Sequence, residues 1–149
     1  MIKPILLLSA CYSANALSQI TVNESLNFGT IVIAKNTPGS SITLFPNGSS
    51  TGNNIYRMKN GHPAELLFEG YGAGVQINIT DIGYQPSLKR VNGGNEFILT
   101  RLIYSNSVIT TNSRGTAILR IGGELSVSGN GQPYLDDSYS TLVELVISY

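Results

Sequence analysis

The chain alternates between apolar and polar residues in many short segments, a pattern typical of β-strands. The clearest example is residues 75–80, where Val75, Ile77 and Ile79 share one face and polar side chains occupy the other. Comparable runs occur near residues 20–28, 31–33, 42–44, 55–58, 65–68, 97–104, 117–127 and 141–149. No segment sustains a 3.6-residue apolar period, and Asn-Gly pairs at 47–48, 60–61, 92–93 and 130–131 predict turns. The pattern predicts an all-β fold, an antiparallel immunoglobulin-like β-sandwich, with a jelly roll or closed barrel as the alternative.

The first predicted strand carries its apolar residues at even positions. Ile31 and Ile33 then occupy odd positions, so Gly29 is expected to form a bulge or bend that turns the chain to the other face. The apolar residues of the first strand are Ile20, Val22, Leu26 and Phe28. Their spacing indicates a strand with one face directed toward a core.

The last predicted strand, residues 141–149, alternates in the same way. Its apolar face consists of Val143, Leu145, Ile147 and Tyr149. Because this strand ends on an aromatic residue without a polar tail, we expect it to pair with a neighbour. That neighbour is either another strand of the same domain or a strand of another chain.

The beginning of the chain has the pattern of a secretory signal peptide. Lys3 precedes an apolar run at residues 5–10, and Ala14-Asn15-Ala16 provides a small-x-small cleavage site. We therefore expect residues 1–16 to be a signal peptide and residues 17–149 to form a single β-sandwich domain. Leu8-Ser9-Ala10-Cys11 also resembles a bacterial lipobox, which makes Cys11 a candidate lipidation site. The rest of the chain has no apolar run of the roughly 20 residues that a membrane-spanning helix needs.

Composition and the positions of polar residues argue against nucleic-acid binding, metal binding and catalysis. Charged residues make up 12% of the 149 residues and the formal net charge is zero, so the chain has no basic footprint for nucleic acid. The only histidine, His62, lies in a predicted turn, and Asp136-Asp137 lacks the pattern of a calcium loop. We expect no metal, no cofactor and no enzymatic activity. Eight tyrosines offer a weak signal for carbohydrate binding, since tyrosine combines a stacking ring with a hydroxyl.

Arg101 interrupts the apolar run at residues 97–104. A charged residue at this position is expected to extend to solvent at a sheet edge, or to pair with a carboxylate such as Glu144. Either role is structural.

Four ordered blocks of this sequence resemble a bacterial secreted family known as domain of unknown function 4402. These blocks are Leu26-Asn-Phe-Gly-Thr-Ile31, residues 42–48, Ile121-Gly-Gly-Glu-Leu-Ser-Val127 and the strand that ends at Tyr149. The resemblance covers the whole of the mature chain. Two features depart from it: residues 133–139 replace a compact turn, and Glu144 replaces a small hydroxyl residue. The family is similar in outline to pilin subunits and spore-coat-U-like proteins exported by chaperone–usher systems.

This resemblance implies an exported subunit of a pilus, fimbria or surface fibre that assembles by β-strand exchange. A periplasmic chaperone, an usher and neighbouring subunits would be its partners, in the periplasm or on the surface of a Gram-negative bacterium. Ile20, Val22, Leu26 and Phe28 would then be donor or first-strand residues, and Val143, Leu145, Ile147 and Tyr149 would pair with the partner. The alternative is a monomeric secreted or lipid-anchored binding module, with carbohydrate as one candidate ligand.

Overall fold

The computed structural model describes residues 17–59, 61–83 and 85–149. The predicted signal peptide (residues 1–16) and the candidate lipidation site Cys11 lie outside the described residues. Within them the chain contains strands and no helix, so none is present that could cross a membrane. The strands are β1 (Gln19–Glu24), β2 (Thr30–Ile33), β3 (Ser41–Leu44), β4 (Ser50–Asn53), β5 (Ile55–Lys59), β6 (Ala64–Glu69), β7 (Gln76–Asp81), β8 (Ser87–Leu88), β9 (Phe97–Tyr104), β10 (Val108–Thr110), β11 (Ala117–Ser126) and β12 (Leu145–Ser148). The predicted all-β class is confirmed.

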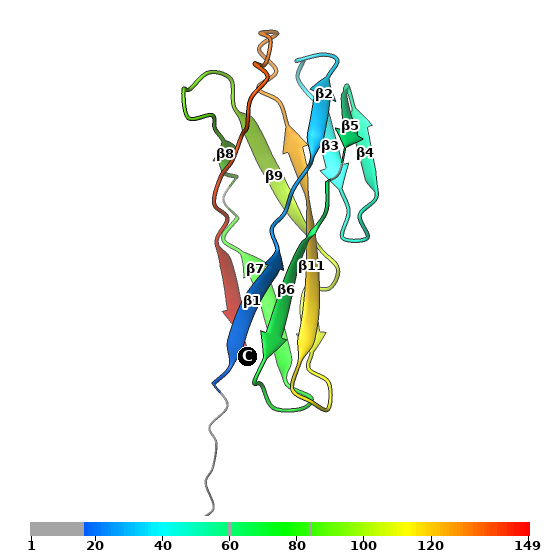
Figure 1. Cartoon of the computed structure of the whole chain (residues 1–149), viewed down its shortest axis with the longest axis vertical. Coiled ribbons are helices and arrows are strands. Elements are labelled where there is room, and N and C mark those ends of the chain that lie inside the picture. The colour runs from blue at the N-terminus through cyan, green and yellow to red at the C-terminus, as the bar shows by residue number, and fades with distance from the viewer. Residues whose placement is uncertain (1–16, 60, 84) are drawn as a thin grey trace, which may run out of the picture.

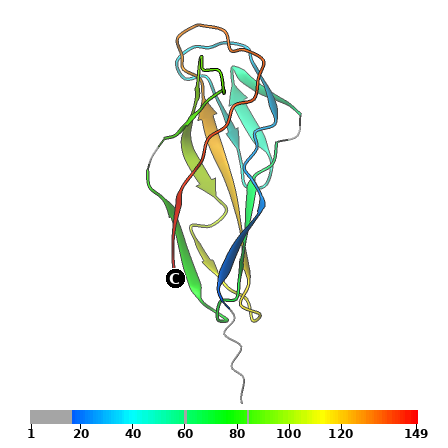
Figure 2. The same cartoon turned by 60° about the vertical axis from the view of Figure 1, so that its left-hand side comes forward.

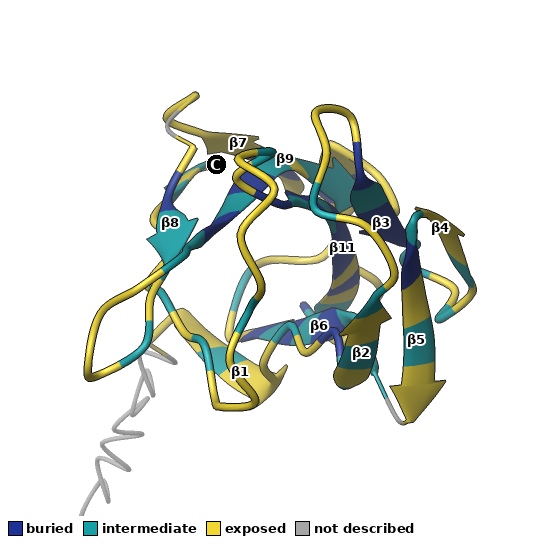
Figure 3. Ribbon diagram, turned by 90° about the horizontal axis from the view of Figure 1, so that it is seen from above, coloured by how far each residue is buried: buried dark blue, intermediate teal, exposed yellow. Residues whose placement is uncertain are grey.

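The strands form three antiparallel sheets (Figure 1). The largest has seven strands, in the order β1-β6-β11-β3-β4, with β9 pairing the other edge of β11 and β8 pairing β9. A second sheet has the order β10-β7-β12, and a third consists of β2 and β5. Seen from above, the strands surround a common interior (Figure 3). The arrangement is a sandwich that approaches a half-barrel.

Strand β11 is the longest strand and joins the two halves of the large sheet. Along one edge its first half pairs with β6, from Ala117↔Phe68 to Ile121↔Ala64, and its second half pairs with β3, from Gly123↔Leu44 onward. Gly122 and Gly123 lie at this change of partner. A Cβ atom on Gly122 would lie 2.0 Å from the carbonyl oxygen of Leu44, so only glycine allows the two backbones to approach this closely.

The interior contains two clusters of buried apolar side chains. The upper cluster lies between the β2–β5 ribbon and the β3, β9 and β11 part of the large sheet. Its buried members are Phe28, Ile42, Leu44, Ile55, Phe97, Leu99, Leu125 and Val127. The lower cluster lies between β6, β11 and the β10-β7-β12 sheet, and consists of Ala64, Leu66, Phe68, Ile77, Ile79, Ile109, Leu119 and Ile121. Leu26 packs against both clusters.

The structure differs from the sequence-based expectations in the partner of Arg101 and in three additional strands. Arg101 does not pair with Glu144: its Nε atom lies 2.7 Å from Oε2 of Glu124. The reason is register, because Arg101 lies directly opposite Glu124 in the β9–β11 ladder. Strands β4, β8 and β10 were not predicted. β4 has the sequence Ser-Thr-Gly-Asn and forms because the turn at residues 45–49 folds it back onto β3, not because of apolar alternation.

Candidate functional site

The candidate site is a seam between the two ends of the chain. We define the N-terminal lip as residues 17–34 and the C-terminal lip as residues 131–149. Both run along the same side of the molecule, with β1 and β12 pointing in opposite directions (Figures 1 and 2). Among the described residues, β1 pairs only with β6, β2 only with β5, and β12 only with β7. The ladders that link the other strands therefore do not continue across the seam.

Inward-facing apolar residues remain exposed on β1. Ile20 lies opposite Phe68 and Val22 opposite Leu66, and residues directly opposite in an antiparallel pair share a face. Phe68 and Leu66 are buried, yet Ile20 is 39% exposed and Val22 59% exposed. Their side chains point toward the interior, but within residues 17–59, 61–83 and 85–149 nothing covers them from the seam side. This is the placement of the first-strand residues predicted from the alternation.

Leu26 and Phe28, the other two residues of that predicted face, hold the N-terminal lip in place. Phe28 is buried in the upper cluster and Leu26 contacts both clusters. Between them, Asn27 and His62 exchange two backbone hydrogen bonds, with N···O distances of 3.0 and 2.8 Å. Gly29 follows with φ of 74°, which makes the predicted bend and directs the chain into β2.

Of the four residues on the predicted apolar face of the last strand, two pack against the lower cluster and two are exposed. Ile147 lies opposite the buried Ile79, and both Leu145 and Ile147 pack against the lower cluster. Val143 precedes β12 and is exposed. Tyr149 follows β12, and its ring centre lies 5.0 Å from that of Tyr71 in an edge-on contact. The strand therefore pairs within its own domain through β7, and its other edge faces the seam.

Above β1 the seam opens into a groove with a volume of about 1100 Å³. Residues 26–34 line one side and residues 131–139 the other, while Leu88, Phe97 and Leu125 are among the residues that line it from the large sheet. The volume exceeds the roughly 300–1,000 Å³ of typical small-molecule pockets. A groove beside a strand edge, lined by apolar side chains of the large sheet and by polar groups of both lips, has the features of a site for an extended peptide. The wall that residues 131–139 form was not predicted from the sequence, because it depends on how that segment folds.

Residues 131–139 have no regular structure but are held by specific contacts. The Tyr134 hydroxyl donates to the backbone oxygen of Glu96 at 2.6 Å and accepts from the backbone nitrogen of Ser128 at 2.9 Å. The Tyr139 hydroxyl donates to the backbone oxygen of Leu135. The rings of both tyrosines pack on Phe97, with ring centres 4.4 and 4.9 Å away. Because their hydroxyls and rings are engaged internally, these tyrosines are poorly placed to stack on a sugar.

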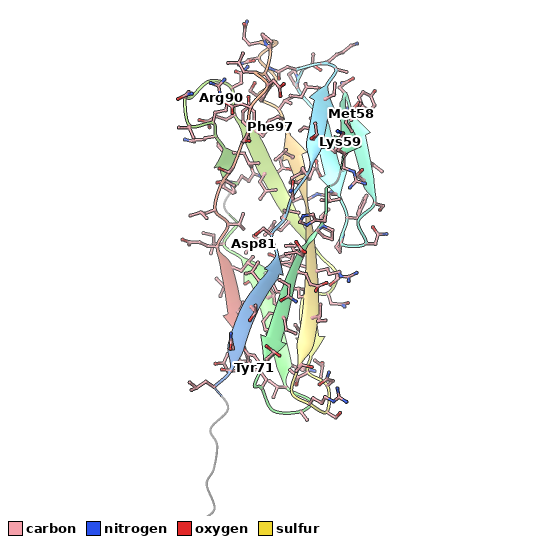
Figure 4. All side chains as sticks on the ribbon, viewed as in Figure 1. Met58, Lys59, Tyr71, Asp81, Arg90 and Phe97 are labelled. Atoms are coloured by element: carbon pink, nitrogen blue, oxygen red, sulfur yellow. The ribbon has the colours of Figure 1, made fainter. Side chains whose placement is uncertain are left out.

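Charged and aromatic side chains mark the two ends of the seam (Figure 4). At the upper end, Nε of Arg90 lies 3.0 Å from Oδ2 of Asp137, at an angle too poor for a hydrogen bond, so charge attraction holds the pair. At the lower end, burial raises the pKa of the Tyr71 phenol, Tyr149 raises it further, and a hydrogen bond with Ser18 opposes both. Tyr71 thus contacts Ser18 of the N-terminal lip and Tyr149 of the C-terminal lip. At the upper end the Arg90–Asp137 pair joins the C-terminal lip to the segment between β8 and β9.

Asn36, two residues after the N-terminal lip, links this part of the chain to residues 129–132, where the C-terminal lip begins. Its amide nitrogen donates to Oδ1 of Asn130 at 2.8 Å and to the backbone oxygen of Gln132 at 2.7 Å. Its amide oxygen accepts from the backbone nitrogen of Gly129 at 2.8 Å. This single side chain fixes the shape of the upper end of the groove.

Asn36→Ala is expected to lower the free energy of unfolding by about 1–3 kcal/mol, because several hydrogen bonds lose their common partner. Amide hydrogen exchange at Gly129 should accelerate, whereas exchange in β7 should change only by the global loss of stability. Asn53→Ala is the matched control, since Asn53 donates one hydrogen bond, to Gly39. Equal effects of the two substitutions would contradict the role of Asn36.

Other polar candidates have structural positions. Nε2 of His62 lies 3.9 Å from Oε2 of Glu24. Hydrogen bonds from Asn23 and then from Arg120 lower the pKa of Glu65, which ties β1 to the outer face of β6. In the part of the chain that the structure describes, no group of three or more histidine, cysteine or acidic side chains converges on a point where a metal could bind.

Comparison with known proteins identifies the family. Searches of curated proteins and of solved structures found no match. The model of one family matches residues 19–149, which include every described strand from β1 to β12. The predicted resemblance to this family is confirmed, and the chain belongs to the family described as Domain of unknown function (DUF4402).

Proposed function

We propose that the protein is a non-enzymatic, exported structural subunit of a pilus, fimbria or other surface fibre, and that it assembles by β-strand exchange. The observation that supports this most is the seam. Two strand edges face it, inward-pointing apolar residues of β1 are exposed along it, and its upper part is a groove over the upper core cluster. A strand inserted between the lips would gain main-chain hydrogen bonds and cover this apolar surface.

In this proposal the N-terminal and C-terminal strands are the two sides of an acceptor site. β1 is already paired with β6 of its own chain and serves as the first strand. The inserted strand comes from a partner polypeptide, either a periplasmic chaperone or a neighbouring subunit. The periplasm and the cell surface are the compartments in which this exchange would occur.

The alternative function, a monomeric binding module for carbohydrate, has weaker support. Tyr134 and Tyr139 are the tyrosines that line the groove, and both use their hydroxyls in bonds to the protein backbone. A sugar would find neither free phenol groups nor open ring faces at this site.

A fused strand tests the acceptor proposal. The C-terminus lies at the lower end of the seam, so a short turn followed by an alternating Val/Ser strand can enter the seam from there (Figure 1). We expect the midpoint of thermal unfolding to rise by roughly 10 °C, because each kcal/mol shifts it by about 2–4 °C in a domain of this size. Amide exchange in β2 should slow as its open edge becomes paired.

The matched control fuses the same strand with serine in place of every valine. It should leave the unfolding midpoint unchanged, because it keeps the length and the linker but removes the apolar side chains. Equal midpoints for the two fusions, together with unchanged exchange in β2, would rule out the acceptor site and leave the monomeric binding module as the better explanation.

A further inference from the structure

We infer that the seam selects a basic strand from a different polypeptide and disfavours the end strands of its own copies. This inference rests on the proposed function, since it names the partner of the acceptor site. It follows from the distribution of charge along the two lips.

The two lips carry carboxylates but no lysine or arginine. Glu24 is the charged residue of the N-terminal lip, and the C-terminal lip contains Asp136, Asp137 and Glu144. All nine lysines and arginines lie elsewhere in the sequence, although the chain as a whole has no net charge. The nearest in sequence is Lys35, one residue beyond the N-terminal lip. The seam is therefore an acidic strip on a neutral protein.

Only part of this negative charge is compensated. Asp137 has Arg90 beside it, whereas Glu24 has only His62, whose Nε2 atom lies 3.9 Å away and which the net charge of zero counts as neutral. Asp136 lines the groove, and Glu144 lines a separate small pocket that also contains Asp81 and Arg101, the latter paired with Glu124. Asp136 and Glu144 are exposed, and neither makes an ion pair among the described residues. These two carboxylates are available to an incoming strand.

The end strands of a second copy do not match this strip. β1 would bring Glu24 into the seam, and the last strand would bring Glu144, so each would place a carboxylate among carboxylates. The strands that do carry cations are committed within the fold. Arg101 in β9 and Arg120 in β11 pair with Glu124 and Glu65 across the large sheet. β5, which carries Arg57 and Lys59, is paired with β2 of its own chain.

A fitting partner strand therefore has two properties. Apolar side chains at alternate positions would enter the groove against Leu88, Phe97 and Leu125. Lysine or arginine at the intervening outward positions would lie near Asp136 and Glu144. Exposed ion pairs add modest affinity individually, but several of them favour one partner over another and speed its association.

Synthetic peptides test this inference with the full-length protein. Three twelve-residue peptides share the same alternating valines and carry lysine, serine or glutamate at the outward positions. A fourth peptide has the sequence of residues 17–28 of this chain. Dissociation constants are measured at about 0.01 M and about 1 M salt, where electrostatic interactions extend over roughly 30 and 3 Å.

We expect the lysine peptide to bind roughly tenfold or more tightly than the glutamate peptide at low salt, with most of this difference lost at high salt. The double variant D136N/E144Q should reduce the difference between the dissociation constants of the lysine and glutamate peptides at low salt. Asp137 is left intact because Arg90 is its partner.

The remaining outcomes distinguish a wrong charge preference of the seam from a wrong assignment of the acceptor site. If the three designed peptides bind equally, or if the peptide of residues 17–28 binds most tightly, the inference is overturned while the acceptor site stands. If no peptide binds and none raises the unfolding midpoint, the acceptor site itself is wrong and the proposed function is lost with it.

Discussion

Gly122→Val is expected to prevent the chain from folding to its native state. A Cβ atom at this position would lie 2.0 Å from the Leu44 carbonyl oxygen and 2.9 Å from the carbonyl carbon. Both are backbone atoms in strands that are fixed by the β11–β3 ladder, so a rotamer change cannot relieve the overlap. We expect a loss of at least 4–5 kcal/mol, among the largest that a single substitution produces. Circular dichroism and urea unfolding of the purified variant would measure it.

Gly122→Ala is the more informative form of this experiment, because it adds only the overlapping Cβ atom. Gly72→Ala is its matched control: its φ is not positive, and a Cβ there would meet only the end of the Val75 side chain, at 3.3 Å. The control should change stability by less than about 1 kcal/mol, as surface substitutions usually do. If both alanine variants unfold at the same urea concentration, the close approach of β11 and β3 is not a constraint on this position.

Local pattern predicted much of the fold. The alternation at residues 75–80 placed Ile77 and Ile79 inward, and both are buried in the lower cluster. Gly29 was expected to redirect the chain and does so with a positive φ. These features follow from side-chain period and turn chemistry, which are encoded within a few residues.

The features that were not predicted depend on contacts between distant residues. β4 consists of polar residues and is a strand only because a turn folds it onto β3. Arg101 pairs with Glu124 because of register, which the sequence of either strand alone does not encode. Whether the last strand pairs inside or outside its chain could not be decided from alternation, which is the same in both cases.

The structure places the first-strand and last-strand residues named from the sequence on the two lips of the seam, but of these eight residues only Leu26 and Phe28 line the groove. The groove itself depends on residues 131–139, which are held by Tyr134 and by Asn36. Both are polar contacts between segments far apart in the chain, so no periodic pattern could have indicated them.

Phe68→Ala is expected to be the most destabilising substitution of a core side chain that borders the seam. Phe68 is fully buried near the end of β6, between Ile20 of β1 and Ala117 of β11 in the sheet. Ala117 is too small to fill the space that the ring would leave, and Ile20 is held on one side only. We expect a loss of about 3–5 kcal/mol, the usual range for phenylalanine to alanine in a core, measured by urea unfolding.

Phe68→Leu tests whether the loss of stability comes from the lost side-chain volume or from any substitution at this position of β6. It keeps most of the apolar contact and should cost less than half as much as the alanine substitution. Because Ile20 rests opposite Phe68, the alanine variant should also show faster amide exchange in β1 than in β3 or β9, beyond the global effect. Uniform acceleration across all strands would mean that β1 is no more easily released than the rest of the sheet. Faster exchange in β1 alone would instead show that this one aromatic side chain holds the N-terminal lip in place. Packing in the lower cluster would then determine the geometry of the acceptor seam.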